Sequence, residues 1–177
     1  MTLNELRDLI PDYGRDIRLN LETVLNVEGA PGLSATQLWG SALACAYSLA
    51  SKELIAVVIA EAKEHLDPAT QEASRSAATI MAMNNVYYRS THLLGDEELK
   101  KMPARLRMNV IGKPGIPKLD FELMSFAVSA LAGCGQCLTA HLHEIRKAGM
   151  ATEGVHSVLR VASVLRAADQ VLRIREL

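Results

Sequence analysis

Apolar residues along this chain recur mainly three or four positions apart, which is the period of an amphipathic α-helix. The first stretch places Leu3, Leu6 and Ile10 on one face and ends at Pro11, which cannot continue a helix. No segment alternates strictly between apolar and polar residues, and no Asn-Gly or Asp-Gly pair marks a β-hairpin. The pattern therefore predicts an all-α protein built as a helical bundle.

Capping residues and helix breakers define where the elements are expected to begin and end. Ser34 and Gln37 form an S-x-x-Q capping box, and Asp67 before Pro68 combines an N-cap with a proline in the first turn. Residues 112–117 contain two glycines and two prolines, which predict an extended linker. Further caps are expected at Ser51, Asp120 and Thr152, and a closing glycine at Gly149. The expected helices cover about residues 3–10, 17–25, 35–49, 52–61, 68–88, 95–101, 103–110, 121–132, 134–148 and 153–175.

The two halves of the chain carry a similar pattern. The run Gln37–Leu43 matches Glu122–Val128 at an offset of 85 residues. We interpret this as an internal duplication, with repeat halves at about 34–90 and 119–175 inside a single domain that spans 1–177. Chance similarity between alanine-rich helices is the alternative.

Composition excludes several classes of protein. The chain has 49% hydrophobic and 22% charged residues, which is typical of a globular core and not of a disordered chain. A net charge of −1 and only 4% aromatic residues argue against binding to nucleic acid or to an anionic membrane. The uncharged stretches 31–51 and 123–140 are interrupted by glycine and polar residues, so we expect buried helices and no membrane span. The basic stretch 99–118 is expected to be a solvated connector, with an acidic partner as the alternative.

The chain has three cysteines, Cys45, Cys134 and Cys137. An odd number in a chain of this length does not indicate a disulfide scaffold, and no apolar export signal begins the sequence. We therefore expect a cytoplasmic protein, in which a close cysteine pair is catalytic, redox-active or metal-binding.

Two thiols and an imidazole fall within two helical turns at Cys134, Cys137 and His141. Cysteines three residues apart can form a disulfide, and Cys137 and His141 are four apart, so they share a helix face. Gly133 indicates a helix N-terminus, where free amides and the helix dipole favour a thiolate. The helix end favours Cys134 as the nucleophile, whereas pairing with an imidazole base favours Cys137. Spacing alone leaves both open.

Glu122 lies on the helix before the cysteine pair, at the edge of an uncharged stretch. A carboxylate buried in apolar surroundings needs a partner, and His141 is the natural one. Glu122 would then fix the tautomer of the imidazole and relay protons. An exposed glutamate in the first helical turn is an equally good interpretation.

Other interpretations of the cysteine cluster are weaker. Zinc is the main alternative, but the second half of a usual structural site is missing, so we expect no metal. A c-type haem would require histidine where Leu138 stands, and a thioredoxin fold would require a βαβ unit. Cys45, Met81 and Met83 are expected to fill the core. His143 is expected on the surface.

Three runs carry a family resemblance. Residues 106–117, 121–130 and 133–141, with 83–89 and 13–21, resemble the AhpD family of alkylhydroperoxidases, within the carboxymuconolactone-decarboxylase-like superfamily. The resemblance implies an all-helical duplicated fold, a homotrimer, and reduction of organic hydroperoxides to alcohols in antioxidant defence, with no tightly bound cofactor. It implies dihydrolipoamide as electron donor, delivered by a lipoylated acyltransferase, and an AhpC-type peroxiredoxin as a further partner.

The resemblance assigns Glu122, Cys134, Cys137 and His141 as catalytic, with a redox-active disulfide between the two cysteines and Cys137 attacking the peroxide. Some relatives carry histidine between the cysteines, where this chain has Gln136, so the proton relay is expected to be shorter here. Two other functions stay open. One is a decarboxylase related to carboxymuconolactone decarboxylase, and the other is a non-enzymatic redox adaptor for a peroxiredoxin.

Overall fold

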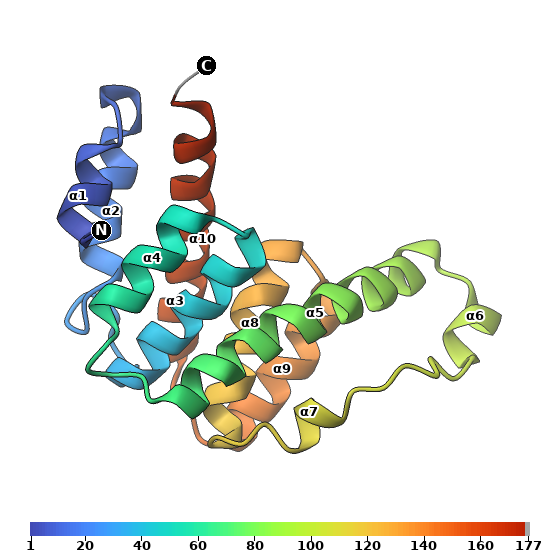
Figure 1. Cartoon of the computed structure of the whole chain (residues 1–177). Coiled ribbons are helices and arrows are strands. Elements are labelled where there is room, and N and C mark those ends of the chain that lie inside the picture. The colour runs from blue at the N-terminus through green and yellow to red at the C-terminus, as the bar shows by residue number, and fades with distance from the viewer. Residues whose placement is uncertain (176–177) are drawn as a thin grey trace.

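The computed structural model describes residues 1–175, and within that range it contains ten α-helices, one 3-10 helix and no strand (Figure 1). The elements are α1 (Leu3–Asp8), η1 (Asp12–Gly14), α2 (Arg15–Val24), α3 (Ala35–Leu49), α4 (Lys52–Glu61), α5 (Pro68–Leu94), α6 (Glu97–Lys101), α7 (Asn109–Gly112), α8 (Lys118–Ala132), α9 (Gly135–Lys147) and α10 (Thr152–Ile174). The predicted all-α class is confirmed. The last two residues of the predicted domain 1–177 lie outside the described residues, and the single-domain and duplication hypotheses stay predictions.

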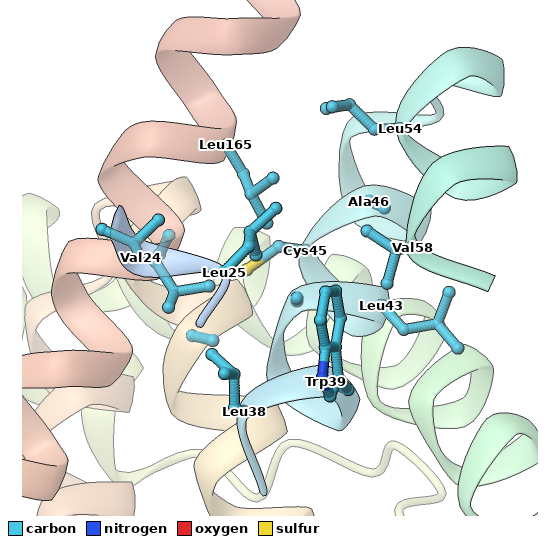
Figure 2. Packing of buried hydrophobic residues seen from close by; sticks show 14 of the residues in the cluster. Val24, Leu25, Leu38, Trp39, Leu43, Cys45, Ala46, Leu54, Val58 and Leu165 are labelled. Carbon is cyan, nitrogen blue, oxygen red and sulfur yellow. The ribbon is translucent and has the colours of Figure 1, made fainter. Parts of the chain in front are cut away.

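Helices α3 and α8 pack against each other at the centre of the bundle, and α5 and α10 pack on both of them (Figure 1). Helix α3 is buried without interruption from Leu38 to Ala46, because it is apolar around most of its circumference. Figure 2 shows this core, in which Leu38, Trp39 and Leu43 pack beside residues of α4 and α10. No helix within residues 1–175 is long and apolar enough to cross a lipid bilayer.

Most of the predicted caps are present. The Ser34 hydroxyl accepts a hydrogen bond from the Gln37 amide, and the Gln37 side chain accepts one from the Ser34 amide, which completes the capping box. The Ser51 hydroxyl caps α4. The Asp67 carboxylate accepts a 2.7 Å hydrogen bond from the Thr70 amide. Hydrogen bonding from the Thr70 side chain, and then from this amide, holds the pKa of Asp67 below its ordinary value.

Two predicted caps are wrong. Pro117 is the N-cap of α8, so Asp120 lies inside the first turn, where its carboxylate accepts a 2.9 Å hydrogen bond from Gln37 Nε2. Helix α10 has Ala151 at its N-cap, and Thr152 is its first residue. In both cases the N-cap lies one or more residues before the residue with capping chemistry.

The expected helix over 103–110 is also wrong. Pro103 excludes the helical region for the residue before it, and Met102 is extended with ψ 133°. Arg105 adopts the left-handed region at φ 51°, so only the short α7 forms farther on. Helix α5 instead continues past Tyr88 to Leu94, where Gly95 ends it in the left-handed region. The segment from α6 to α7 forms an arm that leaves the bundle after α5 and returns to it at α7, where Ile111 packs against the core (Figure 1).

Candidate functional site

The turn between α8 and α9 brings the two predicted cysteines together. Gly133 ends α8 in the left-handed region at φ 66°, and Cys134 is the N-cap of α9. The Cys134 sulfur accepts a 3.3 Å hydrogen bond from the Cys137 amide, as a serine oxygen does at an ordinary N-cap. A disulfide joins Cys134 to Cys137, whose Cα atoms are 5.3 Å apart. The chain therefore holds both sulfurs on one helical turn.

The two sulfurs differ in their access to the outside. Cys134 is 0% exposed, whereas Cys137 is 5% exposed and lines a pocket of about 330 Å³ between α5, α8, α9 and the arm. A molecule that enters this pocket meets Cys137. Cys134 lies behind it.

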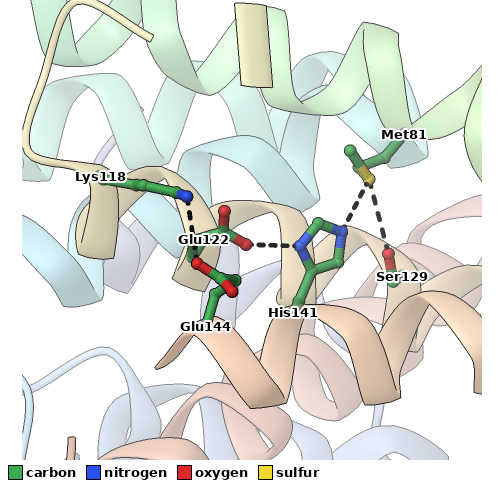
Figure 3. Close-up of polar contacts among 6 residues, drawn as sticks. All are labelled: Met81, Lys118, Glu122, Ser129, His141 and Glu144. Carbon is green, nitrogen blue, oxygen red and sulfur yellow. Dashed lines mark hydrogen bonds and ion pairs between the residues drawn. The ribbon is translucent and has the colours of Figure 1, made fainter. Parts of the chain in front are cut away.

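Glu122 and His141 form a buried hydrogen-bonded pair beside the disulfide (Figure 3). His141 Nδ1 lies 2.7 Å from Glu122 Oε2, and the carboxylate, which is 3% exposed, accepts the ring proton. Of the two interpretations of Glu122, the structure has the buried carboxylate paired with the imidazole. The pairing fixes the ring orientation and compensates for the burial of a carboxylate.

Met81 occupies the other side of the imidazole, which the sequence did not predict. Its Sδ lies 3.2 Å from His141 Nε2 and 3.7 Å from the Ser129 hydroxyl (Figure 3). The two ring nitrogens thus contact Glu122 and Met81, and the predicted contact with Cys137 is not one of the hydrogen bonds of His141. His141 and Cys137 instead line the same pocket. Met81 fills the core as expected, but it also orients the ring.

The rest of the pocket combines an apolar wall with a charged mouth. Met108 and Ile111 of the arm line the pocket together with Cys137. At the mouth, Lys118 Nζ donates a 3.1 Å hydrogen bond to Glu144 Oε2, which lowers the pKa of Glu144 and raises that of Lys118. Both side chains reach solvent, which screens the pair, so it adds little to stability.

The remaining sequence candidates lie elsewhere. Cys45 is fully buried in α3, and desolvation raises the pKa of its thiol to about 12, so it stays neutral and unreactive. His143 is exposed, as predicted. Gln136 is exposed at the rim and lines the pocket without contacting Glu122 or His141 through a hydrogen bond. Within residues 1–175, no three His, Cys, Asp or Glu side chains form a group that could hold a metal ion.

The sequence is similar to curated proteins over nearly its whole length. It is 51% identical to the alkyl hydroperoxide reductase AhpD of Frankia alni, over 94% of this chain and 89% of that one. The AhpD of Rhodospirillum centenum is 47% identical over 97% and 91% of the two chains, and that of Streptomyces griseus is 48% identical over 97% and 96%. The chain belongs to the AhpD family. Residues 97–177 also match the model of the carboxymuconolactone decarboxylase family.

Membership of the AhpD family confirms the resemblance drawn from the sequence. The matched residues 97–177 include the disulfide, Glu122 and His141, but not α5. Met81 therefore belongs to the half of the chain outside that match, and its contact with His141 is visible only once α5 has packed across α9.

Proposed function

We propose that the chain reduces organic hydroperoxides to alcohols through a dithiol–disulfide cycle of Cys134 and Cys137. The observation that supports this most is a disulfide on one helical turn, with Cys137 facing a pocket that also contains a buried Glu122–His141 pair. The relatives compared above carry the name alkyl hydroperoxide reductase.

In this cycle His141, oriented by Glu122, accepts the proton of the Cys137 thiol through a bridging water molecule. The thiolate attacks the terminal oxygen of the hydroperoxide, the O–O bond breaks, and Cys137 becomes a sulfenic acid. The departing alkoxide takes the proton from His141 and leaves as the alcohol. Cys134 then attacks the Cys137 sulfur, which forms the disulfide and releases water.

The disulfide must be reduced again, and we propose dihydrolipoamide on a lipoylated acyltransferase as the donor. Its two thiols exchange with the disulfide and leave as lipoamide, so two electrons and two protons return to the cysteines. A second cavity of about 500 Å³ shares Tyr88 and Gln136 with the first and offers an approach for the dihydrolipoamide group. The cytoplasm, where thiols are kept reduced, is the compartment that suits this cycle, and an AhpC-type peroxiredoxin is a further expected partner.

A homotrimer is the expected assembly. In support, α5 and the arm expose apolar side chains that a partner copy would cover: Val86, Leu93, Leu94 and Met102. Native mass spectrometry should then give three times the 19.2 kDa of one chain. A monomer at micromolar concentration would contradict this assembly.

The test is consumption of cumene hydroperoxide with dihydrolipoamide as the only reductant. Wild type should turn over, whereas Cys134→Ser and Cys137→Ser should not. A decarboxylase of the same fold would keep its activity on a lactone acid in the Cys134→Ser variant. A redox adaptor would form the disulfide with its partner and consume no peroxide by itself.

A further inference from the structure

Asn84 carries a buried polar group that the protein itself leaves without a partner. Its side chain is 5% exposed, and within residues 1–175 its Oδ1 accepts no hydrogen bond. Burying an unpaired acceptor costs about 1–3 kcal/mol, so a side chain of this kind needs an explanation.

The position of Asn84 in the fold indicates what the missing partner is. Asn84 lies one helical turn after Met81 and one turn before Tyr88, and all three line the pocket that contains Cys137. Its main-chain oxygen is 3.9 Å from Cys137 Sγ, so this turn of α5 lies against the reactive sulfur. Asn84 thus belongs to the wall of the pocket in which a substrate meets Cys137, and its unpaired side-chain oxygen is buried in that wall.

An organic hydroperoxide brings the group that this site lacks. Its terminal oxygen carries one O–H donor, and the thiolate must reach that oxygen along the O–O axis, which leaves the O–H bond pointing to one side. Glu122 Oε2 and His141 Nδ1 are already paired with each other. The Oδ1 of Asn84 is a buried acceptor in the pocket wall, and no group within residues 1–175 donates to it.

We propose that Asn84 is a substrate-binding residue whose side-chain oxygen accepts a hydrogen bond from the terminal O–H of the hydroperoxide at Cys137. The alkyl part of the substrate then lies toward Met108 and Ile111. This inference rests on the proposed peroxidase function and adds the group that orients the O–O bond. No new bond is made or broken by Asn84, since it only positions the substrate for attack.

Asn85 provides a matched control. It is the next residue on α5 and is 3% exposed, and neither its side-chain oxygen nor its nitrogen has a partner among residues 1–175. It is not one of the residues that line this pocket. Substituting either asparagine removes a buried amide from the same turn of the same helix. An effect that only reflects helix packing would therefore be seen in both variants.

The test separates the two half-reactions by stopped flow in Asn84→Leu, Asn84→Ala and Asn85→Leu. We expect the rate constant for oxidation of the reduced chain by cumene hydroperoxide to fall roughly tenfold in both Asn84 variants, the value of about one hydrogen bond. In the Asn84 variants the rate constant for reduction of the disulfide by dihydrolipoamide should stay within about twofold of the wild-type value. In Asn85→Leu the rate constants of both steps should stay within about twofold of wild type.

Unchanged oxidation in the Asn84 variants would overturn the inference. Equal losses in both half-reactions, or equal losses in Asn85→Leu, would also overturn it, because they indicate a packing effect. A wild-type chain that is reduced by dihydrolipoamide but never oxidised by peroxide would instead overturn the proposed function, and the inference with it.

Discussion

The α3–α4 turn and the α8–α9 turn share one backbone design. Each first helix ends at a left-handed residue, Ala50 at φ 54° and Gly133 at φ 66°. The next residue is the N-cap of the second helix, Ser51 in one and Cys134 in the other, and each side chain accepts a hydrogen bond from the amide three residues on. A cysteine at an N-cap is therefore a sulfur in the place of a serine oxygen.

The chemistry of the two turns is different. At an offset of 83 residues, Trp39, Leu54 and Val58 occupy the positions of Glu122, Cys137 and His141. The first set is apolar and belongs to the core, whereas the second contains one cysteine of the disulfide and the buried hydrogen-bonded pair of Glu122 and His141. The comparison shows that the turn itself is structural, and that four side chains, Cys134 and these three, make the second turn a candidate site.

The largest effect should come from Cys137, the residue that most separates the two turns. Cys137→Ser should lower peroxide consumption by at least about a hundredfold, because a hydroxyl at this position is a far weaker nucleophile than a thiolate. Circular dichroism should show an unchanged helical fold. If the serine variant keeps its peroxidase rate, Cys137 is not the attacking residue.

Cys45 serves as an internal control for that measurement. Its pKa of about 12 keeps the thiol neutral at pH 8, so iodoacetamide should modify Cys137 in the reduced native chain and leave Cys45 unmodified. In the unfolded chain the exposed thiol has its ordinary pKa of 9.0, so the folded state keeps the Cys45 proton to a higher pH than the unfolded state does. Stability from this group is thus complete below about pH 9 and is lost as the pH rises toward 12.

The next largest effect should come from the Glu122–His141 pair. His141→Gln should slow oxidation of the reduced chain by about 10²-fold, because the thiol loses its base. Glu122→Gln should slow it less, since the imidazole stays but loses the carboxylate that orients it. Both variants should change the pH profile of the oxidation rate.

His143→Gln is the matched control for that comparison, since His143 is exposed two residues along the same helix. We expect its oxidation rate and pH profile to match wild type. Equal losses in the His141 and His143 variants would show that the pair has no special role.

A smaller effect is expected at Met81. Met81→Leu keeps the volume but removes the sulfur that contacts His141 Nε2, so oxidation by peroxide should slow about threefold to tenfold. Met124→Leu is the control, because its Sδ contacts Ser74 rather than the site. Both variants should cost less than about 1.5 kcal/mol in stability, measured by urea unfolding. If Met124→Leu is oxidised by peroxide as slowly as Met81→Leu, the role of Met81 is packing alone.

The sequence predicts the helices wherever local chemistry decides them. The capping box at Ser34 and the Asp67-Pro68 start are local signals, and both predict their helices correctly. The cysteine spacing likewise predicts that Cys134 and Cys137 come together. Asp120 and Thr152 show the limit, because a residue with capping chemistry can lie one or more positions inside the helix.

The α5 side of the site is not predictable in this way. Met81 lies 60 residues from His141 and Asn84 lies 53 from Cys137, and only the packing of α5 across α9 brings them together. Their spacing in sequence is that of any buried helix face. The internal match between the two halves of the sequence pairs Gln37 with Glu122. When the halves are aligned on their N-caps, Ser51 and Cys134, Trp39 pairs with Glu122 instead. An N-cap is a fixed structural reference, whereas an alanine-rich run is not.

The smallest effects should come from exchanging the two left-handed residues. Gly133→Ala meets no atom within 4 Å, so its cost is the left-handed backbone alone, about 1 kcal/mol, or a few degrees in Tm. Ala50→Gly relieves the same strain but adds freedom to the unfolded chain, so it should raise stability by about 0.5 kcal/mol or less. Peroxide reduction should change little in either variant, because no side chain of the site is displaced. Changes in Tm of opposite sign in the two variants would show that both turns use the same backbone state. A lower Tm for Ala50→Gly would mean that the α3–α4 turn depends on the methyl group of Ala50 and is not structurally equivalent to the turn that carries the cysteines.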